Sequence, residues 1–519
     1  MSAELDVPLS PAIHDHGDPT LEKQDDLRRL IVRGGAMLVG SRLLMQIVSW
    51  AVTLLVARLL SPYDYGVITT GGIFLGMGDL LAEAGVGKAL VQKSLLTEDD
   101  LAESFTLSFA LALVLYAVIF CSSGAAASFF RNADLASYLR VAGLLLFLIP
   151  FRSVPLAILE RRFQMGRQAA VHIASGLIQA GVTLALAVGG WGFWSLLAGT
   201  AGARVVESSM LSSQAGWSPR FGPPRLAGGG LASFGAHVSA ASLLWYAYSN
   251  SDFVVVGKLG GPAELGYYSL AFGLISLPVQ KLTVNLNQVA YPFYCRLQHD
   301  PERLKGWYLR LTSLVGFVAL PAMVGMALVA EDGITMALGR KWAPAVLPFQ
   351  LLSIVGVFMV FGSSLPPLLN ALGRPDVNSR YSMCCMFAYP LAFVLSGARY
   401  GMVGVCAAWV AIYPMALYLF FSLTRSITRV GPYDLVRSQS VALASTLIMV
   451  PSVFLVNHWA GAAEPPLVRF ASSVAAGVAS YGLGVLLLGR GKLAIELRAV
   501  RDALTSGRPE PRASSSPEI

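Results

Sequence analysis

Four basic side chains interrupt long apolar stretches of this sequence, and they are the first candidates for chemistry: Arg42, Arg152, Arg204 and Lys281. A cation among apolar residues is costly unless an anion or water accompanies it. It therefore either binds an anionic group, such as a phosphate, or forms an ion pair within the protein. Both roles stay open for Arg42 and Lys281. Arg152 follows Pro150 near the end of an apolar stretch, where its guanidinium can also reach the aqueous surface.

Two acidic residues, Asp79 and Glu83, lie four positions apart and so share one face if their segment is helical. A carboxylate in a low-dielectric environment can carry a proton or hold a cation. Both residues are candidates for coupling to a H⁺ or Na⁺ gradient, and the alternative is an ion pair with Arg42 or with a base from another helix. Arg204 precedes Glu207 by three residues, so an ion pair on one helix is the favoured interpretation of Arg204.

Polar and aromatic side chains accompany these charges. Asn285 and Asn287 follow Lys281 within two turns, and their amides suit either sugar hydroxyls or hydrogen bonds between helices. Trp245 and Tyr246 lie in the middle of an apolar stretch. Their rings could stack on sugars, with packing in the protein interior as the alternative.

The elements that must position these residues are membrane-spanning helices. The 519 residues are 55% hydrophobic and 13% charged, whereas soluble domains carry about 25% charged residues. The mean hydropathy is +0.61. Continuous apolar runs of about 20 residues recur, the length that crosses a bilayer as a helix. We therefore predict an all-α membrane protein with about 14 spans: 34–57, 66–86, 104–128, 136–158, 168–190, 192–212, 233–256, 265–290, 308–330, 345–369, 381–398, 402–423, 439–457 and 468–488.

The distribution of basic residues predicts the orientation. With a cytoplasmic N-terminus, the predicted inner segments hold 26 of the 38 basic residues and the outer loops hold seven. The positive-inside rule then places both termini of this multi-pass inner-membrane protein in the cytoplasm. The net charge of +8 is explained by this topology and by anionic membrane lipids, so nothing in it indicates a nucleic-acid partner.

The ends of the chain and its cysteines indicate no further chemistry. Residues 1–33 form a polar cytoplasmic segment without the pattern of a signal peptide, and 489–519 form a basic, partly disordered cytoplasmic tail. The five cysteines lack metal-ligand spacing. We expect no metal, no cofactor and no catalytic residues. Thr97, followed by Asp100 three residues later, predicts a capped helix start at the cytoplasmic surface.

The sequence contains an internal repeat with an offset of 200 residues. The segment "ARLLSPYDYG" at 57–66 aligns with "GKLGGPAELG" at 257–266, matching Pro62 with Pro262 and Gly66 with Gly266. Farther along, "LERRF" at 159–163 corresponds roughly to "LGRPD" at 372–376. Six spans separate the copies, so both run in the same direction, which predicts two lobes related by an axis along the membrane normal.

The same segments carry a family resemblance. "ARLLSPYDYGVITT", "EAGVGKALVQKSLLTEDDL", "ILERRFQM", "SDFVVVGKLGGPAELGYYSLAFGLISLPVQKL" and "NALGRPD" resemble the Wzx-type flippases of the multidrug/oligosaccharidyl-lipid/polysaccharide exporter superfamily. The resemblance covers about residues 30 to 425. It implies an N-lobe at 34–215, a C-lobe at 230–425 and two additional helices at 439–488. It also implies transfer of undecaprenyl-diphosphate-linked oligosaccharide units to the periplasmic leaflet for exopolysaccharide or O-antigen synthesis.

The resemblance and the charges together predict a cationic central cavity that works by alternating access. Arg42 and Lys281 would face this cavity, and arginines at the inner surface would attract the diphosphate. A polysaccharide polymerase and a co-polymerase are the expected protein partners. The alternatives are an ion-coupled multidrug antiporter of the same superfamily, a peptidoglycan-precursor flippase, and a membrane enzyme such as a sugar polymerase. The short outer loops disfavour the enzyme.

Overall fold

The computed structural model describes residues 51–83, 90–91, 93, 96–162, 164–223, 245–460, 465–489 and 491. These residues are helical or lie in turns and short connections, with no β-strand among them. Nine helices in this part of the chain are long and apolar enough to cross a membrane. The prediction of an all-α membrane protein is therefore confirmed.

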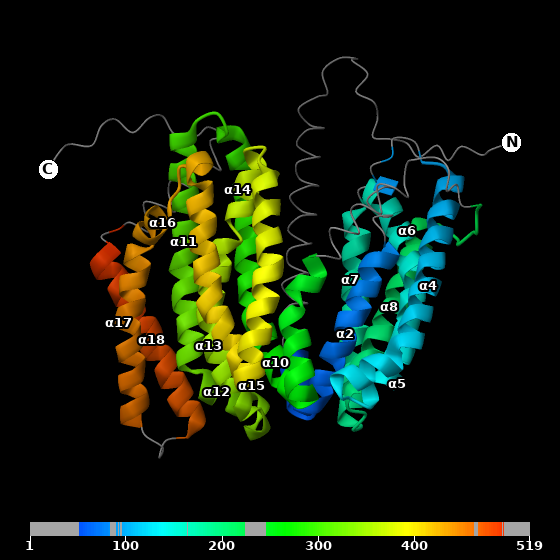
Figure 1. Ribbon diagram of the computed structural model, residues 1–519, viewed down its shortest axis with the longest axis horizontal. Helices are drawn as coiled ribbons and strands as arrows, with labels where there is room; N and C mark the ends of the chain where they lie inside the picture. Colours follow the sequence, from blue (N-terminus) through cyan, green and yellow to red (C-terminus); the bar gives the residue numbers. More distant parts are fainter. Residues whose placement is uncertain are drawn as a thin grey trace. The chain divides into compact units, whose positions relative to one another are not determined.

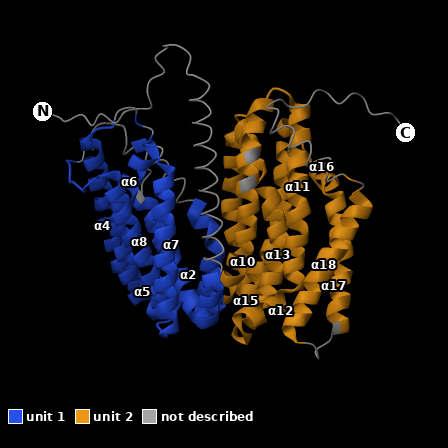
Figure 2. Ribbon diagram, turned by 180° about the vertical axis from the view of Figure 1, so that it is seen from behind, with its two compact units in different colours: residues 1–266 blue, residues 267–519 orange. Residues whose placement is uncertain are grey.

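The chain forms two compact units, residues 1–266 and 267–519 (Figure 2). In unit 1, residues 51–59 are helical and the following helices are α2 (Pro62–Glu83), α4 (Glu98–Phe130), α5 (Asp134–Ala142), the 3-10 helix η1 (Gly143–Leu148), α6 (Ile149–Arg161), α7 (Met165–Val188) and α8 (Phe193–Ala215). Residues 245–249 are also helical, and α10 (Ser251–Leu297) begins in unit 1 and continues into unit 2.

Unit 2 continues with α11 (Pro301–Leu328), α12 (Ala330–Leu338), the 3-10 helix η2 (Arg340–Ala345), α13 (Val346–Gly362), α14 (Leu365–Ala371), α15 (Pro375–Thr428), α16 (Pro432–Ser438), α17 (Ser440–Ala460) and α18 (Pro466–Gly489) (Figure 1). The long helix α15 breaks at Gly401, where φ is 59°. This break separates the two spans predicted at 381–398 and 402–423.

Helix starts follow local sequence signals. Thr97 accepts a hydrogen bond from the Asp100 amide, and the Asp100 side chain accepts one from the Thr97 amide, which confirms the predicted capping box at the start of α4. Pro62 begins α2, and a proline fits a first helical turn because it has no amide hydrogen to leave unpaired.

Glycines let the helices of unit 1 pack closely around α2. A Cβ atom at Gly71 would lie 2.1 Å from the ring of Tyr138, and one at Gly78 would lie 3.0 Å from Leu146. Tyr138 and Leu146 are both buried. Helix α2 is therefore held against α5 and η1, and this contact positions the polar residues near its end.

Candidate functional site

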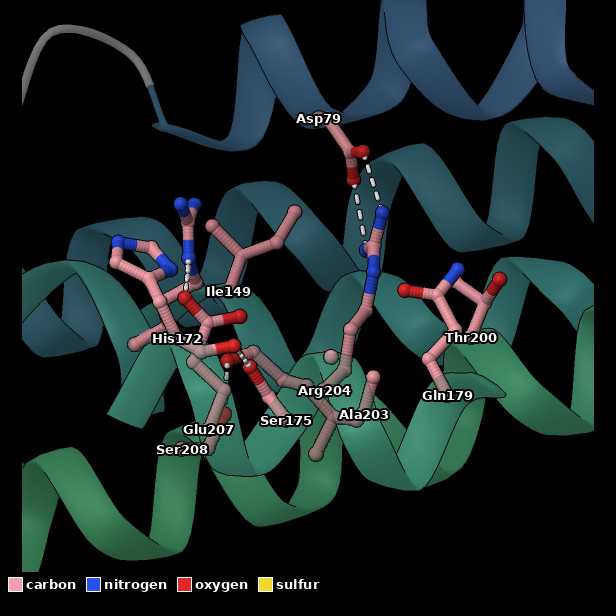
Figure 3. A pocket seen from close by; sticks show the side chains of 13 residues that line it. Asp79, Ile149, His172, Ser175, Gln179, Thr200, Ala203, Arg204, Glu207 and Ser208 are labelled. Carbon is pink, nitrogen blue, oxygen red and sulfur yellow. Dashed lines mark hydrogen bonds and ion pairs between the residues drawn. The ribbon is translucent and has the colours of Figure 1, made fainter. Parts of the chain in front are cut away.

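Unit 1 contains a cavity of about 470 Å³ between its helices, lined by both polar and apolar side chains. Helices α2, α6, α7 and α8 and the junction of η1 with α6 supply its lining: Asp79, Leu148, Ile149, Arg152, His172, Ser175, Gly176, Gln179, Thr200, Ala203, Arg204, Glu207 and Ser208. Figure 3 shows Arg204 between two groups of polar side chains, with His172, Ser175 and Glu207 on one side and Gln179 and Thr200 on the other. We call this space the polar cavity.

Arg204 binds Asp79 through both nitrogens of its guanidinium end. Its Nη1 lies 3.0 Å from Asp79 Oδ1, and its Nη2 lies 2.6 Å from Asp79 Oδ2 (Figure 3). Two parallel charge-assisted hydrogen bonds of this kind fix geometry as well as charge. Asp79 therefore pairs with a base from another helix, which is the alternative that the sequence left open for it.

The predicted ion pair between Arg204 and Glu207 is wrong. Glu207 instead accepts a hydrogen bond of 2.8 Å from Arg152 Nε, which reaches it from α6. Residues three apart on a helix gain only about 0.2–0.5 kcal/mol from pairing. Arg204 of α8 neutralises Asp79 of α2, and Arg152 of α6 neutralises Glu207 of α8. Each pair thus joins two helices, and the sequence spacing alone does not reveal such pairs.

Helix α7 contributes a polar stripe that the sequence analysis missed. His172, Ser175, Gly176 and Gln179 all line the polar cavity, and their spacing of three, four and seven residues is that of one helix face. A search for polar residues at this period within an apolar span would have found the stripe.

The polar cavity is close to electrically neutral, since Arg152 and Arg204 face Glu207 and Asp79. Among the described residues, no cluster of His, Cys, Asp and Glu is arranged to hold a metal ion.

A second polar surface lies on α10 in unit 2. Lys281 is exposed and has no ion-pair partner among the described residues. Gln288 and Tyr291 are exposed seven and ten residues later, which places them on the same helix face as Lys281. Val284, three residues after Lys281, is also exposed on this face, so the face combines polar and apolar side chains.

The other predicted site residues are distributed as follows. Asn287 donates a hydrogen bond of 3.3 Å to the carbonyl oxygen of Ser363, which follows the end of α13. The sequence had left two roles open for this amide, and the structure shows the hydrogen bond within the protein. Trp245 is 58% exposed, so its ring is available for contact. Arg42 lies outside the described residues, as do the side chains of Glu83 and Asn285.

Several arginines predicted to attract cargo at the inner surface are bonded to the protein itself. Arg161 Nη1 donates to the carbonyl oxygens of Leu90, at 3.0 Å, and of Lys93. Arg162 donates to the Ala215 carbonyl oxygen at 3.0 Å. Arg161 and Arg162 therefore hold connecting segments in place.

Unit 2 contains a cavity of about 510 Å³ with an almost wholly apolar lining, which we call the apolar cavity. It lies among α11, α17 and α18 and is lined by Phe317, Val318, Pro321, Ala322, Gly325, Met326, Val329, Met449, Val453, Phe470, Ser473, Val474, Gly477, Val478 and Tyr481. Beside it, Tyr481 donates a hydrogen bond of 2.7 Å to the Phe317 carbonyl oxygen.

Comparison with known proteins shows the family. The chain belongs to the family described as "Polysaccharide biosynthesis protein", whose model matches residues 55–347. It is 24% identical over 373 residues to the lipopolysaccharide biosynthesis protein WzxC of Escherichia coli (strain K12), covering 69% of this chain and 73% of WzxC. It is also 24% identical over 441 residues to the succinoglycan biosynthesis transport protein ExoT of Rhizobium meliloti (strain 1021), covering 85% and 89%.

Solved structures show the fold. A structure of the lipid II flippase MurJ in an inward closed conformation superposes with a TM-score of 0.69 at 13% identity, covering 88% of this chain and all of MurJ. An inward-facing multidrug resistance transporter of the MATE family and MOP superfamily has a TM-score of 0.57 at 16% identity, covering 74% and 94%. The chain therefore shares the fold of MurJ and of this MATE-family transporter.

Proposed function

We propose that this member of the polysaccharide biosynthesis family is a flippase for lipid-linked oligosaccharides. It moves undecaprenyl-diphosphate-linked repeat units from the cytoplasmic to the periplasmic leaflet of the inner membrane, for exopolysaccharide or O-antigen synthesis. The similarity to WzxC and ExoT along most of the chain supports this cargo class. The observation that carries the proposal for the site is Lys281, an exposed cation on the long helix α10 with the exposed Gln288 on the same face.

The chemistry of the cargo explains why an exposed lysine is proposed as its contact. A diphosphate and a sugar chain both lose their hydration on entering the membrane, and a cation with neighbouring hydrogen-bonding groups replaces part of it. Lys281 would contact the diphosphate, and Gln288 and Tyr291 on the same face would contact sugar hydroxyls. Arg42 and Trp245 remain further candidates for these contacts.

The polar cavity is the proposed site of energy coupling. Protonation of Asp79, or binding of Na⁺ to it, would free Arg204 and loosen the bond between α2 and α8. Transport then proceeds by alternating access as this bond forms and breaks. The cargo reaches a periplasmic polymerase and co-polymerase, with both termini of the flippase in the cytoplasm.

The multidrug antiporter is the weaker alternative, because the two carboxylates of the polar cavity are already neutralised by arginines. A cavity for cationic drugs would offer carboxylates without such partners.

The test is a deletion strain in which polymer export and lipid-linked intermediates are measured together. We expect polymer to disappear while diphosphate-linked repeat units accumulate on the cytoplasmic side, and the wild-type gene to restore export. Unchanged polymer with increased sensitivity to cationic dyes would instead identify a drug antiporter. Accumulation of peptidoglycan precursors would identify the cargo as lipid II.

A further inference from the structure

Arg140 of unit 1 lies where membrane proteins rarely place a charge. It is six residues past the start of α5 at Asp134, about 9 Å along the helix, and its side chain is exposed. The segment Asp134–Arg161 is long and apolar enough to cross a membrane. Charged residues in such segments usually face the bundle interior or pair with an opposite charge. Arg140 is exposed instead, and no carboxylate of the described residues pairs with it.

The surface around Arg140 is apolar. Helix α4 packs beside α5 (Figure 1). The exposed residues of α4 between positions 113 and 121 are all apolar: Leu113, Val114, Ala117, Val118, Phe120 and Cys121. Val141 and Leu144, which follow Arg140 in the chain, are exposed as well. Lipid chains are as apolar as these side chains, so Arg140 lies on a surface that suits contact with lipid.

Contacts with α4 hold the guanidinium of Arg140 in one position. Its Nε donates a hydrogen bond of 3.0 Å to Ser123 Oγ. Ser123 is buried, and its hydroxyl donates in turn to the Phe120 carbonyl oxygen at 2.7 Å, so the oxygen of this hydroxyl is available to accept. The guanidinium carbon lies 5.2 Å from the centre of the Phe120 ring, within the range of a cation–π contact. An arginine that only extended toward water would need neither contact.

Most of the hydrogen-bonding capacity of Arg140 is unused within the protein. A guanidinium has five N–H groups, and Ser123 accepts from the one on Nε. The four on Nη1 and Nη2 have no hydrogen-bond partner in the part of the chain that the structure describes. These are the groups with which arginine binds a phosphate through two parallel hydrogen bonds. An anion at this position would offset the cost of placing the charge beside hydrocarbon.

We propose that Arg140 binds the phosphate group of a membrane phospholipid, whose acyl chains lie on the exposed apolar residues of α4 and α5. We call this the lipid-phosphate site. A phospholipid supplies a phosphate and apolar chains together, and the long arginine side chain brings its guanidinium toward headgroup level. A free phosphate ion would leave Phe120, Val141 and Leu144 without a partner. The charge distribution predicts that this end of α5 is periplasmic, so the lipid belongs to the periplasmic leaflet.

The lipid-phosphate site is tested by thermal unfolding of the purified full-length protein in detergent micelles. Dioleoylphosphatidylglycerol should raise the unfolding temperature, because a ligand that binds the native state stabilises it. Dioleoylglycerol has the same chains without phosphate, and inorganic phosphate has no chains, so neither should raise it. An equal rise with dioleoylglycerol would exclude the phosphate contact. An equal rise with inorganic phosphate would show a free-anion site and exclude the phospholipid.

Variants locate the site. Arg140→Gln should increase the phosphatidylglycerol concentration at half-maximal effect about tenfold, as for a lost charge-assisted contact. Arg140→Lys should increase it about threefold, because the charge remains but the paired donors do not. Phe120→Leu keeps an apolar surface, removes the aromatic face and should also cost about threefold. Arg399→Gln makes the same change of charge at another exposed position and should bind as the wild type does.

Equal half-maximal concentrations for Arg140→Gln and Arg399→Gln would overturn the lipid-phosphate site. If Arg140→Gln does not fold, Phe120→Leu decides, and wild-type binding by that variant would overturn the site in the same way. The site does not depend on the proposed cargo. Normal polymer in the deletion strain would refute the flippase and leave the lipid titration unchanged, whereas a failed titration would leave polymer export unchanged.

Discussion

The two units contain cavities of similar volume and opposite chemistry. The polar cavity of unit 1 measures about 470 Å³ and is lined by two arginines and two carboxylates. The apolar cavity of unit 2 measures about 510 Å³ and has Ser473 and Tyr481 as its polar lining residues. Apolar space between membrane helices leaves no polar group unsatisfied, whereas charges inside a bundle must be paired at a cost in free energy. The comparison shows that unit 1 keeps paired charges in its cavity, whereas the cavity of unit 2 has none.

The largest expected effect comes from breaking the polar cavity at Asp79. Asp79→Ala leaves Arg204 without its carboxylate inside the bundle and should lower the free energy of unfolding by about 2 kcal/mol, the partial exposure of both side chains being taken into account. Chemical unfolding in detergent micelles measures this change. The double variant Asp79→Ala/Arg204→Ala should recover more than half of the loss.

The exposed pair of Arg220 with Glu98 is the control for Asp79. Both of its side chains are largely in solvent, so Glu98→Ala should change stability by less than about 1 kcal/mol. Equal losses from Asp79→Ala and Glu98→Ala would show that the polar cavity does not depend on its charges.

The next effect concerns Lys281, an exposed cation for which no ion pair is found among the described residues. Lys281→Ala should lower polymer export about tenfold, as expected for a lost charge-assisted contact with an anionic cargo. Lys281→Arg should keep most of the activity because the charge remains. Arg399→Ala, at another exposed position, should export normally. Full export by Lys281→Ala, at wild-type abundance, would remove Lys281 from the pathway.

A smaller effect is expected from replacing one alanine in each cavity with leucine, which adds three carbon atoms to the side chain. Ala203 lines the polar cavity and Ala322 lines the apolar cavity. Ala203→Leu should lower export several-fold because it displaces water from the ion pairs. Ala322→Leu should leave export close to normal. A complementation assay with both variants at matched abundance measures the difference, and the reverse order would assign the functional role to the apolar cavity.

The smallest effect is expected from the ion pair at the edge of unit 2. Arg469 of α18 binds Asp332 of α12 through two hydrogen bonds near the ends of both helices. Asp332 is buried, but the arginine that Asp332→Ala leaves behind lies in the first turn of α18, where its long side chain can reach the aqueous surface. The loss should therefore be about 1 kcal/mol. Unfolding of this variant beside Asp79→Ala provides the measurement. A loss as large as that of Asp79→Ala would contradict the assumed difference in depth.

The sequence predicted the helices better than their partners. Runs of apolar residues predicted the all-α membrane class, the Thr97 and Asp100 pattern located a helix start, and the repeat aligned Pro62 with Pro262 and Gly66 with Gly266. These features depend on residues close in sequence or on composition. The partner of Arg204 depends on how α2, α6 and α8 pack, and no local pattern encodes it.

The polar residues that α7 contributes to the polar cavity could not be predicted from the sequence for a related reason. His172 and Gln179 are single polar residues among apolar ones, and each alone is compatible with ordinary helix packing. They become a site only because α7 turns them toward Arg152 and Arg204. The distances between these helices, and not the residue types, create the polar cavity.

Gly66 and Gly266 occupy equivalent positions in the two copies of the repeat. Each lies against the proline carbonyl oxygen of the other copy, because a Cβ atom at either glycine would come within 1.8 Å of that oxygen. A contact in which both partners offer the same proline and the same glycine is complementary to itself, as is the contact between identical subunits of a twofold-symmetric dimer. One duplicated turn thus supplies both halves of a contact within a single polypeptide.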